Sequence, residues 1–284
     1  MSRKILITLC AFVCFFNGTL AQQSRLDFLL DEFENHPEHI LVTAHRAAHQ
    51  KYPENSLAAL KEAIRLQVDI VEIDVRKTKD HQLVILHDET IDRVTNGKGE
   101  LKDLTLKEVK KYNLLFNGKS TDQKILTFDE ALDVLKGEVL INIDFKAGKD
   151  AISEAYRTIK KKGMEKQALF YVYNHYELLA KLNNLDPNII VWPRAYSKDD
   201  VEKILTYPNI QLIQIDFSFY EDKWTKEVIQ KGIRLSGNAL GKYDHLEEEN
   251  GTGFNKITKK HINIIETDFP EELLLYLKKK NLHL

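Results

Sequence analysis

The sequence predicts an α/β protein, a (β/α)₈ TIM barrel with a small insertion after its second strand. Apolar strand-like runs alternate with amphipathic helical segments along most of the chain. This alternation indicates a parallel sheet, and eight such units in about 250 residues are typical of this barrel. An open doubly wound sheet would call for a glycine-rich first turn. The first turn here, AHRAAHQKYPENS, contains no glycine, so the barrel is favoured.

The strands and helices can be placed in order along the chain. The first strand is HILVTA, and the helix that follows begins near Asn55, with Asn55 or Ser56 as N-cap. The eight strands are predicted at residues 39–44, 69–75, 138–145, 168–173, 188–192, 210–216, 232–237 and 262–267. Later helices are predicted at residues 127–136, 150–162, 175–183, 198–206, 222–230, within 244–260, and at 270–280.

Residues 88–126 interrupt the alternation. They are polar and rich in glycine and asparagine, and they contain one short predicted helix at 105–112. A further short strand, QLVILHD at 82–88, leads into this segment and stands outside the eight. We interpret the segment as an insertion within a single domain that spans residues 22–284.

The N-terminus has the pattern of a secretory signal peptide. Arg3 and Lys4 precede the apolar run ILITLCAFVCFF, and Thr19 and Ala21 supply small residues before a cleavage site. Residues 1–21 are therefore predicted to be removed near Ala21, and the protein is expected to be exported, to a periplasm or outside the cell. The alternative is an uncleaved membrane anchor, which the shortness of the apolar run disfavours.

Composition limits the classes of function. The chain has 284 residues, 41 basic and 43 acidic, and its formal net charge of −2 does not favour binding to nucleic acid. Both cysteines, Cys10 and Cys14, lie in the predicted signal peptide, so the mature protein has no thiolate nucleophile. The sequence gives no indication of membrane contact, and it leaves the oligomeric state open.

Charged residues interrupt two of the predicted buried strands. Glu72 and Asp74 lie two residues apart in DIVEIDV and therefore point to the same face. Asp144 and Lys146 repeat this spacing in INIDFK. Adjacent buried carboxylates repel one another unless a cation lies between them. One such pair is commonly a structural ion pair, but several at the carboxyl ends of barrel strands favour an active site.

These side chains suggest phosphate chemistry. Glu72, Asp74 and Asp144 offer the oxygen ligands that Mg²⁺ or Ca²⁺ prefers. His45 and His87 also follow predicted strands, and they suit a general acid and a general base. The positive charges of Arg46 and Lys146 are typical of sites that bind phosphate; the whole set is His45, Arg46, Glu72, Asp74, His87, Asp144 and Lys146.

The same motifs, taken in order, resemble the glycerophosphodiester phosphodiesterase family. The resemblance spans about residues 40–280 and is strongest over 42–100. The matching motifs are His45-Arg46-Ala47, Pro53-Glu54-Asn55-Ser56, Glu72-Ile73-Asp74-Val75, His87-Asp88 followed by Arg93, Thr95 and Gly97, then INIDFK and the closing IIETDFPEELLLYL. Each motif alone would be weak, but their order and spacing are specific.

The resemblance implies metal-dependent hydrolysis of a small phosphodiester to glycerol 3-phosphate and an alcohol. It implies an acid–base pair, a substrate-binding pair and a set of ligands for a divalent cation, Mg²⁺ or Ca²⁺. By position these are His45 and His87, then Arg46 and Lys146, then Glu72, Asp74 and Asp144. Glu54 is expected to support the first loop or the metal site, or alternatively to lie at the helix start.

Three positions depart from the family pattern. Ala47 stands where a glycine is usual, which adds a Cβ at a tight bend. Asp144 is one methylene shorter than the glutamate common in the family. Late in the chain, a loop with Asn238 replaces a Trp-Thr motif, which leaves the alcohol of the substrate undefined.

Other functions fit parts of the pattern. A phospholipase-like phosphodiesterase would use the same site on lipid or lysolipid head groups, with NHYELL or SFYEDKW meeting the membrane. A non-catalytic exported binding protein would not require the histidine pair. A glycoside hydrolase needs two carboxylates and no histidines, so it ranks below both.

Overall fold

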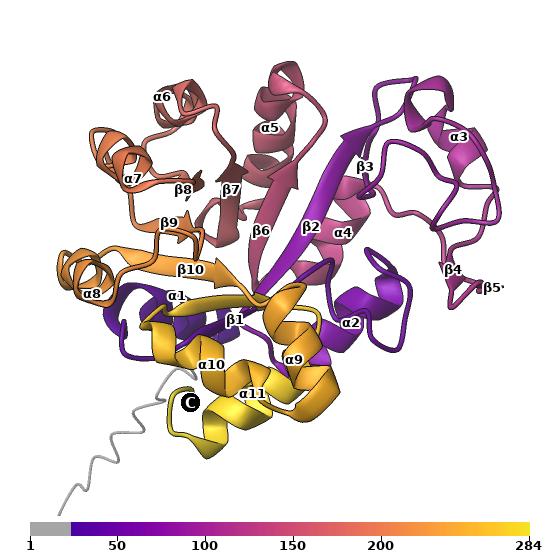
Figure 1. Cartoon of the computed structure of the whole chain (residues 1–284). Helices are drawn as coiled ribbons and strands as arrows, with labels where there is room; N and C mark the ends of the chain where they lie inside the picture. The colour runs from indigo at the N-terminus through magenta and orange to yellow at the C-terminus, as the bar shows by residue number, and fades with distance from the viewer. Residues whose placement is uncertain (1–23) are drawn as a thin grey trace, which may run out of the picture.

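Eight parallel strands close into a barrel in the computed structural model, which describes residues 24–284 (Figure 1). Around the barrel the order is β1, β2, β6, β7, β8, β9, β10 and β11, and β11 pairs with β1. The strands are β1 (Leu41–Ala44), β2 (Ile70–Lys77), β6 (Leu140–Phe145), β7 (Ala168–Val172), β8 (Ile190–Ala195), β9 (Leu212–Ile215), β10 (Arg234–Asn238) and β11 (Ile264–Thr267). The predicted TIM barrel is confirmed, and each strand overlaps its predicted range.

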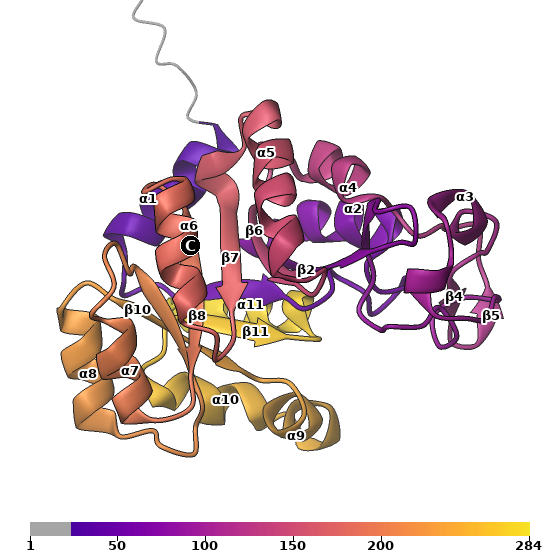
Figure 2. The same ribbon diagram turned by 90° about the horizontal axis from the view of Figure 1, so that it is seen from above.

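Helices surround the barrel on its outer side (Figures 1 and 2). They are α2 (Leu57–Leu66), α4 (Phe128–Leu135), α5 (Ile152–Lys162), α6 (Glu177–Leu185), α7 (Lys198–Ile204), α8 (Asp222–Gln230), α9 (Lys242–Asn250), α10 (Gly253–Ile257) and α11 (Pro270–Lys279). Short 3₁₀ turns are η2 (Lys149–Ala151), η3 (Glu165–Gln167) and η4 (Thr258–Lys260). Ser56 is the N-cap of α2, because its hydroxyl accepts the Ala59 N–H.

The predicted insertion forms a small unit beside the barrel (Figures 1 and 2). Strand β3 (Leu83–Ile85) lies antiparallel to β2, and it leads to η1 (Leu101–Asp103), α3 (Leu106–Val109), β4 (Leu115–Phe116) and β5 (Lys119–Ser120). A separate apolar cluster holds the unit together: Val84, Leu86, Ile91, Val94, Leu101, Val109, Leu114 and Ile125. The insertion is therefore packed and lies next to the carboxyl end of β2.

The interior of the barrel changes character along its axis. Because alternate strand residues share a face, the first inward residue of most strands is apolar. These residues form one buried cluster: Leu41, Ile70, Leu140, Leu169, Ile190, Leu212 and Ile264, with Trp192 above them. The next inward positions are mostly polar, and they include Glu72, Asn142 and Gln214. Inward polar side chains are thus concentrated toward the end of the barrel where the strands finish, with Arg234 as an exception at the other end.

Helix α1 (Arg25–Asn35) closes the apolar end of the barrel, and the sequence analysis did not predict it. Its Leu29 and Phe33 pack against the apolar cluster inside the barrel. Arg234, at the first inward position of β10, donates hydrogen bonds to the carbonyl oxygens of Glu32, Phe33 and His36. This guanidinium satisfies carbonyl groups that a helix C-terminus leaves unpaired, which explains a buried arginine in an apolar layer.

Two expectations concern segments beyond the barrel. The predicted signal peptide at 1–21, with cleavage near Ala21, lies outside the described residues, so export stays a prediction. Within residues 24–284, no helix combines the length and apolar character that crossing a bilayer requires.

Truncating Leu29 to alanine should destabilise the fold. Leu29 is fully buried, and deleting buried methyl groups typically costs about 2–5 kcal/mol of unfolding free energy. Urea unfolding should show this loss in the Leu29→Ala variant. Leu275→Ala on α11 is the matched control, because Leu275 is 65% exposed and should change stability by less than about 0.5 kcal/mol. Equal effects of the two changes would contradict the closing role of α1.

Candidate active site

Six of the seven predicted site residues line one cavity at the carboxyl end of the barrel. The cavity measures about 110 Å³, and these residues are His45, Glu72, Asp74, His87, Asp144 and Lys146. The seventh, Arg46, lies beside it, with its Nε 3.8 Å from an Asp74 carboxylate oxygen. The structure therefore brings together side chains that are up to 101 positions apart in sequence, from 45 to 146.

Three buried carboxylates converge in this cavity. Asp74 of β2 is directly opposite Asp144 of β6 in the sheet register, and Glu72 lies two residues earlier on the same face. One oxygen from each of the three lies within 4.8 Å of the others. Asp144 Oδ1 is buried and has no hydrogen-bond partner among residues 24–284. The shorter side chain of Asp144, noted as a departure, thus still reaches the cluster.

The negative charges of these carboxylates repel one another. Burial, reinforced by the charges of Asp74, Glu266 and Asp144, raises the pKa of Glu72 well above its usual range. Burial would also raise the pKa of Asp74, but the ammonium of Lys146 outweighs it and holds that pKa below its ordinary value. Lys146 donates to Asp74, and its Nζ is 3.0 Å from Asp144 Oδ2. One lysine therefore offsets only part of the negative charge.

Hard cations suit this donor set. The ligand atoms are carboxylate oxygens, and Mg²⁺ and Ca²⁺ bind oxygen in preference to nitrogen or sulfur. An unpartnered buried carboxylate oxygen and a strongly raised glutamate pKa both indicate missing positive charge. Glu72, Asp74 and Asp144 therefore fit a divalent cation.

Glu266 is a fourth buried acid at the site, and the sequence analysis did not select it. It lies inward on β11, and its carboxylate, that of Glu72 and a ring nitrogen of His45 approach within 4.8 Å of one another. Burial raises the pKa of Glu266 to about 7, against the lowering effect of His45. An acid inside a predicted buried strand was the signal already used for Glu72, and IIET carries the same signal.

Each site histidine is held by a carboxylate. His45 Nδ1 is 2.8 Å from Asp268 Oδ1, and His87 Nδ1 is 2.7 Å from Asp88 Oδ1. Because Nδ1 is engaged in both cases, Nε2 is the nitrogen left for chemistry. Burial opposes protonation of His45, but the hydrogen bond to Asp268 and the charges of Glu266 and Asp268 raise its pKa above the ordinary value.

The loop after β1 turns sharply under the site. Arg46 and Ala47 have φ of 50° and 66°, in the left-handed region that non-glycine residues rarely adopt. The Arg46 N–H donates to Glu72 Oε2 at 2.6 Å, and the Ala47 N–H donates to the Glu72 carbonyl. The bend expected at this position is therefore present. Ala47 adopts it without a glycine, and the hydrogen bonds to Glu72 hold it there.

Polar residues of the same loop orient the site. Asn55 Nδ2 donates to Asp74 Oδ2 at 2.8 Å and so fixes that carboxylate. Glu54 accepts hydrogen bonds from Arg46 at 3.1 Å and from Arg93 of the insertion at 2.7 Å. Arg93 also donates to Asp88, the partner of His87. Glu54 thus supports the first loop and connects it to the insertion, and it lies outside the carboxylate cluster described above.

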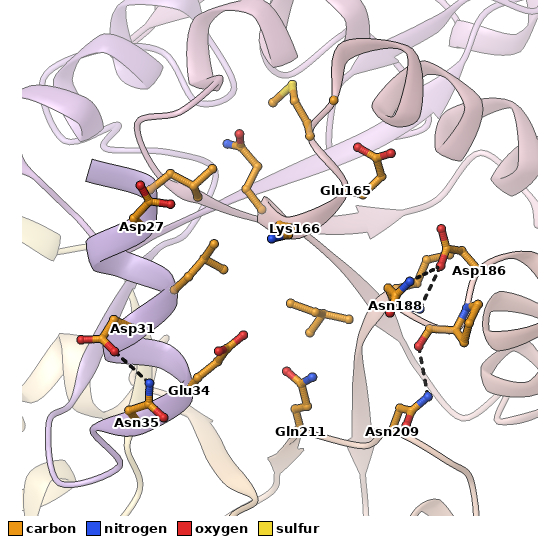
Figure 3. A pocket seen from close by; sticks show the side chains of 18 of the residues that line it. Asp27, Asp31, Glu34, Asn35, Glu165, Lys166, Asp186, Asn188, Asn209 and Gln211 are labelled. Carbon is orange, nitrogen blue, oxygen red and sulfur yellow. Dashed lines mark hydrogen bonds between the residues drawn. The ribbon is translucent and has the colours of Figure 1, made fainter. Parts of the chain in front are cut away.

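A larger hollow lies at the opposite end of the barrel. It measures about 1330 Å³ and lies between α1 and the loops that lead into β7, β8 and β9 (Figure 3). Its acidic side chains are Asp27, Asp31, Glu34, Glu165 and Asp186. Those on α1 are exposed to solvent, where carboxylates need no ligand. Active sites of these barrels occur at the carboxyl ends of the strands, so we assign the candidate site to the smaller cavity.

Comparison with known proteins finds several that are similar to this chain. Residues 45–208 match the model of the glycerophosphoryl diester phosphodiesterase family. A glycerophosphodiester phosphodiesterase of Caldanaerobacter subterraneus subsp. tengcongensis is 40% identical over 145 residues, which cover 49% of this chain and 60% of that protein. A glycerophosphodiester phosphodiesterase of Bacillus subtilis is 30% identical over 225 residues, 75% of this chain and 72% of that protein.

A solved structure has a similar fold. A phosphodiesterase from Oleispira antarctica, in complex with the product sn-glycerol-3-phosphate, superposes with a TM-score of 0.70 at 21% identity. The match covers 84% of this chain and 97% of that chain.

Replacing Asp268 by asparagine should lower the pKa of His45. The change removes the negative charge that favours the imidazolium form, so neutral imidazole becomes more stable and the titration moves to lower pH. Histidine NMR titration of the folded protein would measure this shift. Asp88→Asn is the matched control, because it acts on His87 and should leave the His45 titration in place. An unchanged His45 titration in Asp268→Asn would refute the assigned contact.

Proposed function

The chain belongs to the glycerophosphoryl diester phosphodiesterase family, and from this premise we propose that it hydrolyses glycerophosphodiesters to glycerol 3-phosphate and an alcohol. The observation that carries the proposal is the shared cavity of two imidazoles and four carboxylates. Each imidazole has Nδ1 held by an acid, which leaves Nε2 for proton transfer. The Oleispira relative with bound product supports the substrate class.

The carboxylates of Glu72, Asp74 and Asp144 would hold a divalent cation, Mg²⁺ or Ca²⁺. When bound, such an ion supplies positive charge to a phosphoryl oxygen and neutralises the clustered acids. Glu266 is close enough to Glu72 to support the same site.

Two cationic side chains would orient the phosphate. Arg46 Nε is buried and lacks a hydrogen-bond partner within the described part of the chain, so this N–H is available to an oxygen of the substrate. Lys146 is held in place by Asp74 and Asp144, which also keep its pKa above the ordinary value despite burial. Lys146 thus remains charged beside the cavity.

The histidines divide the proton transfers. One removes a proton from the nucleophile, and the other protonates the departing alkoxide oxygen. With water as the nucleophile, glycerol 3-phosphate forms directly. With the neighbouring glycerol hydroxyl, a cyclic phosphate forms first and water then opens it to glycerol 3-phosphate. A raised pKa keeps His45 protonated over a wider pH range, which suits the general acid. We therefore assign His45 as the acid and His87 as the base.

Two alternatives use the same fold. A phospholipase-like activity would act on lipid or lysolipid head groups, and a binding protein would release no product at all. Soluble glycerophosphocholine, assayed with and without EDTA, separates the three hypotheses. Metal-dependent release of glycerol 3-phosphate supports the phosphodiesterase.

His45→Ala and His87→Ala should each lower turnover of glycerophosphocholine by about 10²–10⁴-fold, the usual contribution of a general acid or base. Release of glycerol 3-phosphate by purified variants would measure this. His36→Ala is the control, since His36 lies just after α1 at the other end of the barrel. Turnover at the wild-type rate in both site variants would defeat the acid–base assignment.

Removing the metal should abolish turnover, and adding Mg²⁺ or Ca²⁺ back should restore it. In Asp144→Asn, the metal concentration for half-maximal activity should rise at least about ten-fold, because even outer-shell changes weaken metal binding by about 10–100-fold. Asp133→Asn on the exposed face of α4 serves as the control. Full activity after exhaustive dialysis against EDTA would exclude the proposed cation site.

A further inference from the structure

A cluster of two histidines and a glutamate lies where α1 ends, at the apolar end of the barrel. Glu32 and His36 are four residues apart and therefore lie on one face of the helix. The chain then turns back, because the His39 N–H donates to the His36 carbonyl at 3.0 Å. One ligand atom from each of the three residues lies within 4.8 Å of the others. We call this group the α1 cluster.

The carboxylate of Glu32 is the buried member of the α1 cluster. Its side chain is 6% exposed, and its only hydrogen-bond partner in the described part of the chain is His39 Nδ1, 2.7 Å from Oε2. His36 Nε2 is 4.0 Å from the other oxygen, Oε1. Arg234 lies nearby, but it donates to the carbonyl groups of Glu32 and His36 and not to this carboxylate. A buried carboxylate that only imidazoles contact is a favourable position for a cation.

A second carboxylate orients His36 toward that acid. Glu38 Oε1 is 3.2 Å from His36 Nδ1, so Nε2 is the nitrogen directed at Glu32. Histidines that bind metals typically donate their other N–H to a carboxylate, which fixes the tautomer and the orientation of the ring. The His36 and His39 rings stack with centroids 5.5 Å apart and planes 16° from parallel. Both rings are therefore held in place before any ion binds.

The donor atoms distinguish the α1 cluster from the candidate active site. Two imidazole nitrogens and one carboxylate oxygen suit Zn²⁺, whereas the all-oxygen set suits Mg²⁺ or Ca²⁺. Donors of a tetrahedral zinc lie about 3.3 Å apart when each bond is about 2.0 Å long. The separations from Glu32 to His39 and His36, 2.7 and 4.0 Å, lie on either side of this value, so small side-chain rotations would form the site.

The surrounding charge also favours a dication. Three carboxylates have an oxygen within 4.0 Å of a His36 ring nitrogen, those of Asp31, Glu32 and Glu38. Arg234 supplies one positive charge nearby. Two negative charges remain when the imidazoles are neutral, and one Zn²⁺ offsets them. Asp31 Oδ2, 3.6 Å from His36 Nε2, can provide the fourth ligand or accept from a water molecule in that position.

We propose that Glu32, His36 and His39 bind Zn²⁺ in a structural site that is separate from the reaction centre. Glu32 lies within α1, and His39 lies two residues before β1. The ion would therefore join the helix that closes the barrel to its first strand. Because zinc would bind the folded chain more tightly than the unfolded one, it should stabilise the fold. The site lies at the opposite end of the barrel from the catalytic set, so it acts on stability and not on turnover.

Zinc binding and thermal unfolding of the tag-free protein test the site. The protein is stripped of metal and then kept in millimolar Mg²⁺, which competes for the carboxylates of the candidate active site. In the wild type, Zn²⁺ at a hundred times its Kd should raise Tm by about 5 °C or more. Glu32→Gln and His39→Gln should each weaken zinc binding at least about ten-fold in calorimetry and remove most of that rise.

His261→Gln is the matched control. His261 Nε2 also lies close to one acid, 3.2 Å from Asp222, but it belongs to no cluster of three ligands among residues 24–284. This variant should keep the zinc affinity and the zinc-dependent Tm of the wild type. An equal loss in His261→Gln would show adventitious binding to surface histidines and overturn the site.

Two further outcomes would also overturn the proposal. One is a wild-type Tm that zinc does not raise, and the other is an unchanged zinc affinity in Glu32→Gln and His39→Gln. If these variants do not fold, histidine NMR of the wild type decides, because Zn²⁺ should shift the imidazole signals of His36 and His39 before those of His45 and His87. Signals of His36 and His39 that stay in place at saturating zinc would refute the site.

Discussion

Repulsion among buried carboxylates at the end of the barrel is the constraint on which the rest of the site depends. Glu72, Asp74, Asp144 and Glu266 are all nearly inaccessible to solvent. Within residues 24–284, Lys146 is the only cation that donates a hydrogen bond to any of these four side chains. The fold tolerates this arrangement because the opposite end of the barrel is largely apolar and supplies stability through ordinary packing. The same eight strands therefore carry a well-packed apolar cluster at one end and a group of mutually repelling carboxylates at the other.

Alternate residues of each strand point into the barrel, and this pattern determines which residues reach the candidate site. Most strands contribute an apolar first inward residue to the base, a second to a mostly polar middle layer and the residue at their end to the rim of the candidate site, and Arg234 of β10 is the exception in the base. Strand β2 follows this order with Ile70, Glu72 and Asp74. The same order on β9 gives Leu212, then Gln214, then Asp216, and the last two line a second cavity of about 320 Å³. Both cavities therefore follow from one repeated pattern.

Sequence reasoning found the barrel, and it selected side chains that the fold brings together in one cavity, because both depend on local, periodic signals. Charges inside apolar runs identified Glu72, Asp74 and Asp144, and the strand–helix alternation identified the fold. Helix α1 was missed because it precedes the alternation and pairs with no strand of its own. Asp268 was missed because its role exists only through a contact with His45 across 223 residues. Glu266 could have been found, since it interrupts a strand in the same way as Glu72.

The salt bridge between Arg93 and Glu54 limits which segments could replace the insertion. Through it, the inserted unit is joined to the turn after β1, and through Asp88 it is joined to His87. The part of the insertion that meets the barrel is thus connected through Asp88 to an imidazole of the candidate site. A segment grafted here from another protein would have to bring an arginine to this point, or the Asp88 and Glu54 carboxylates would lose their shared guanidinium partner.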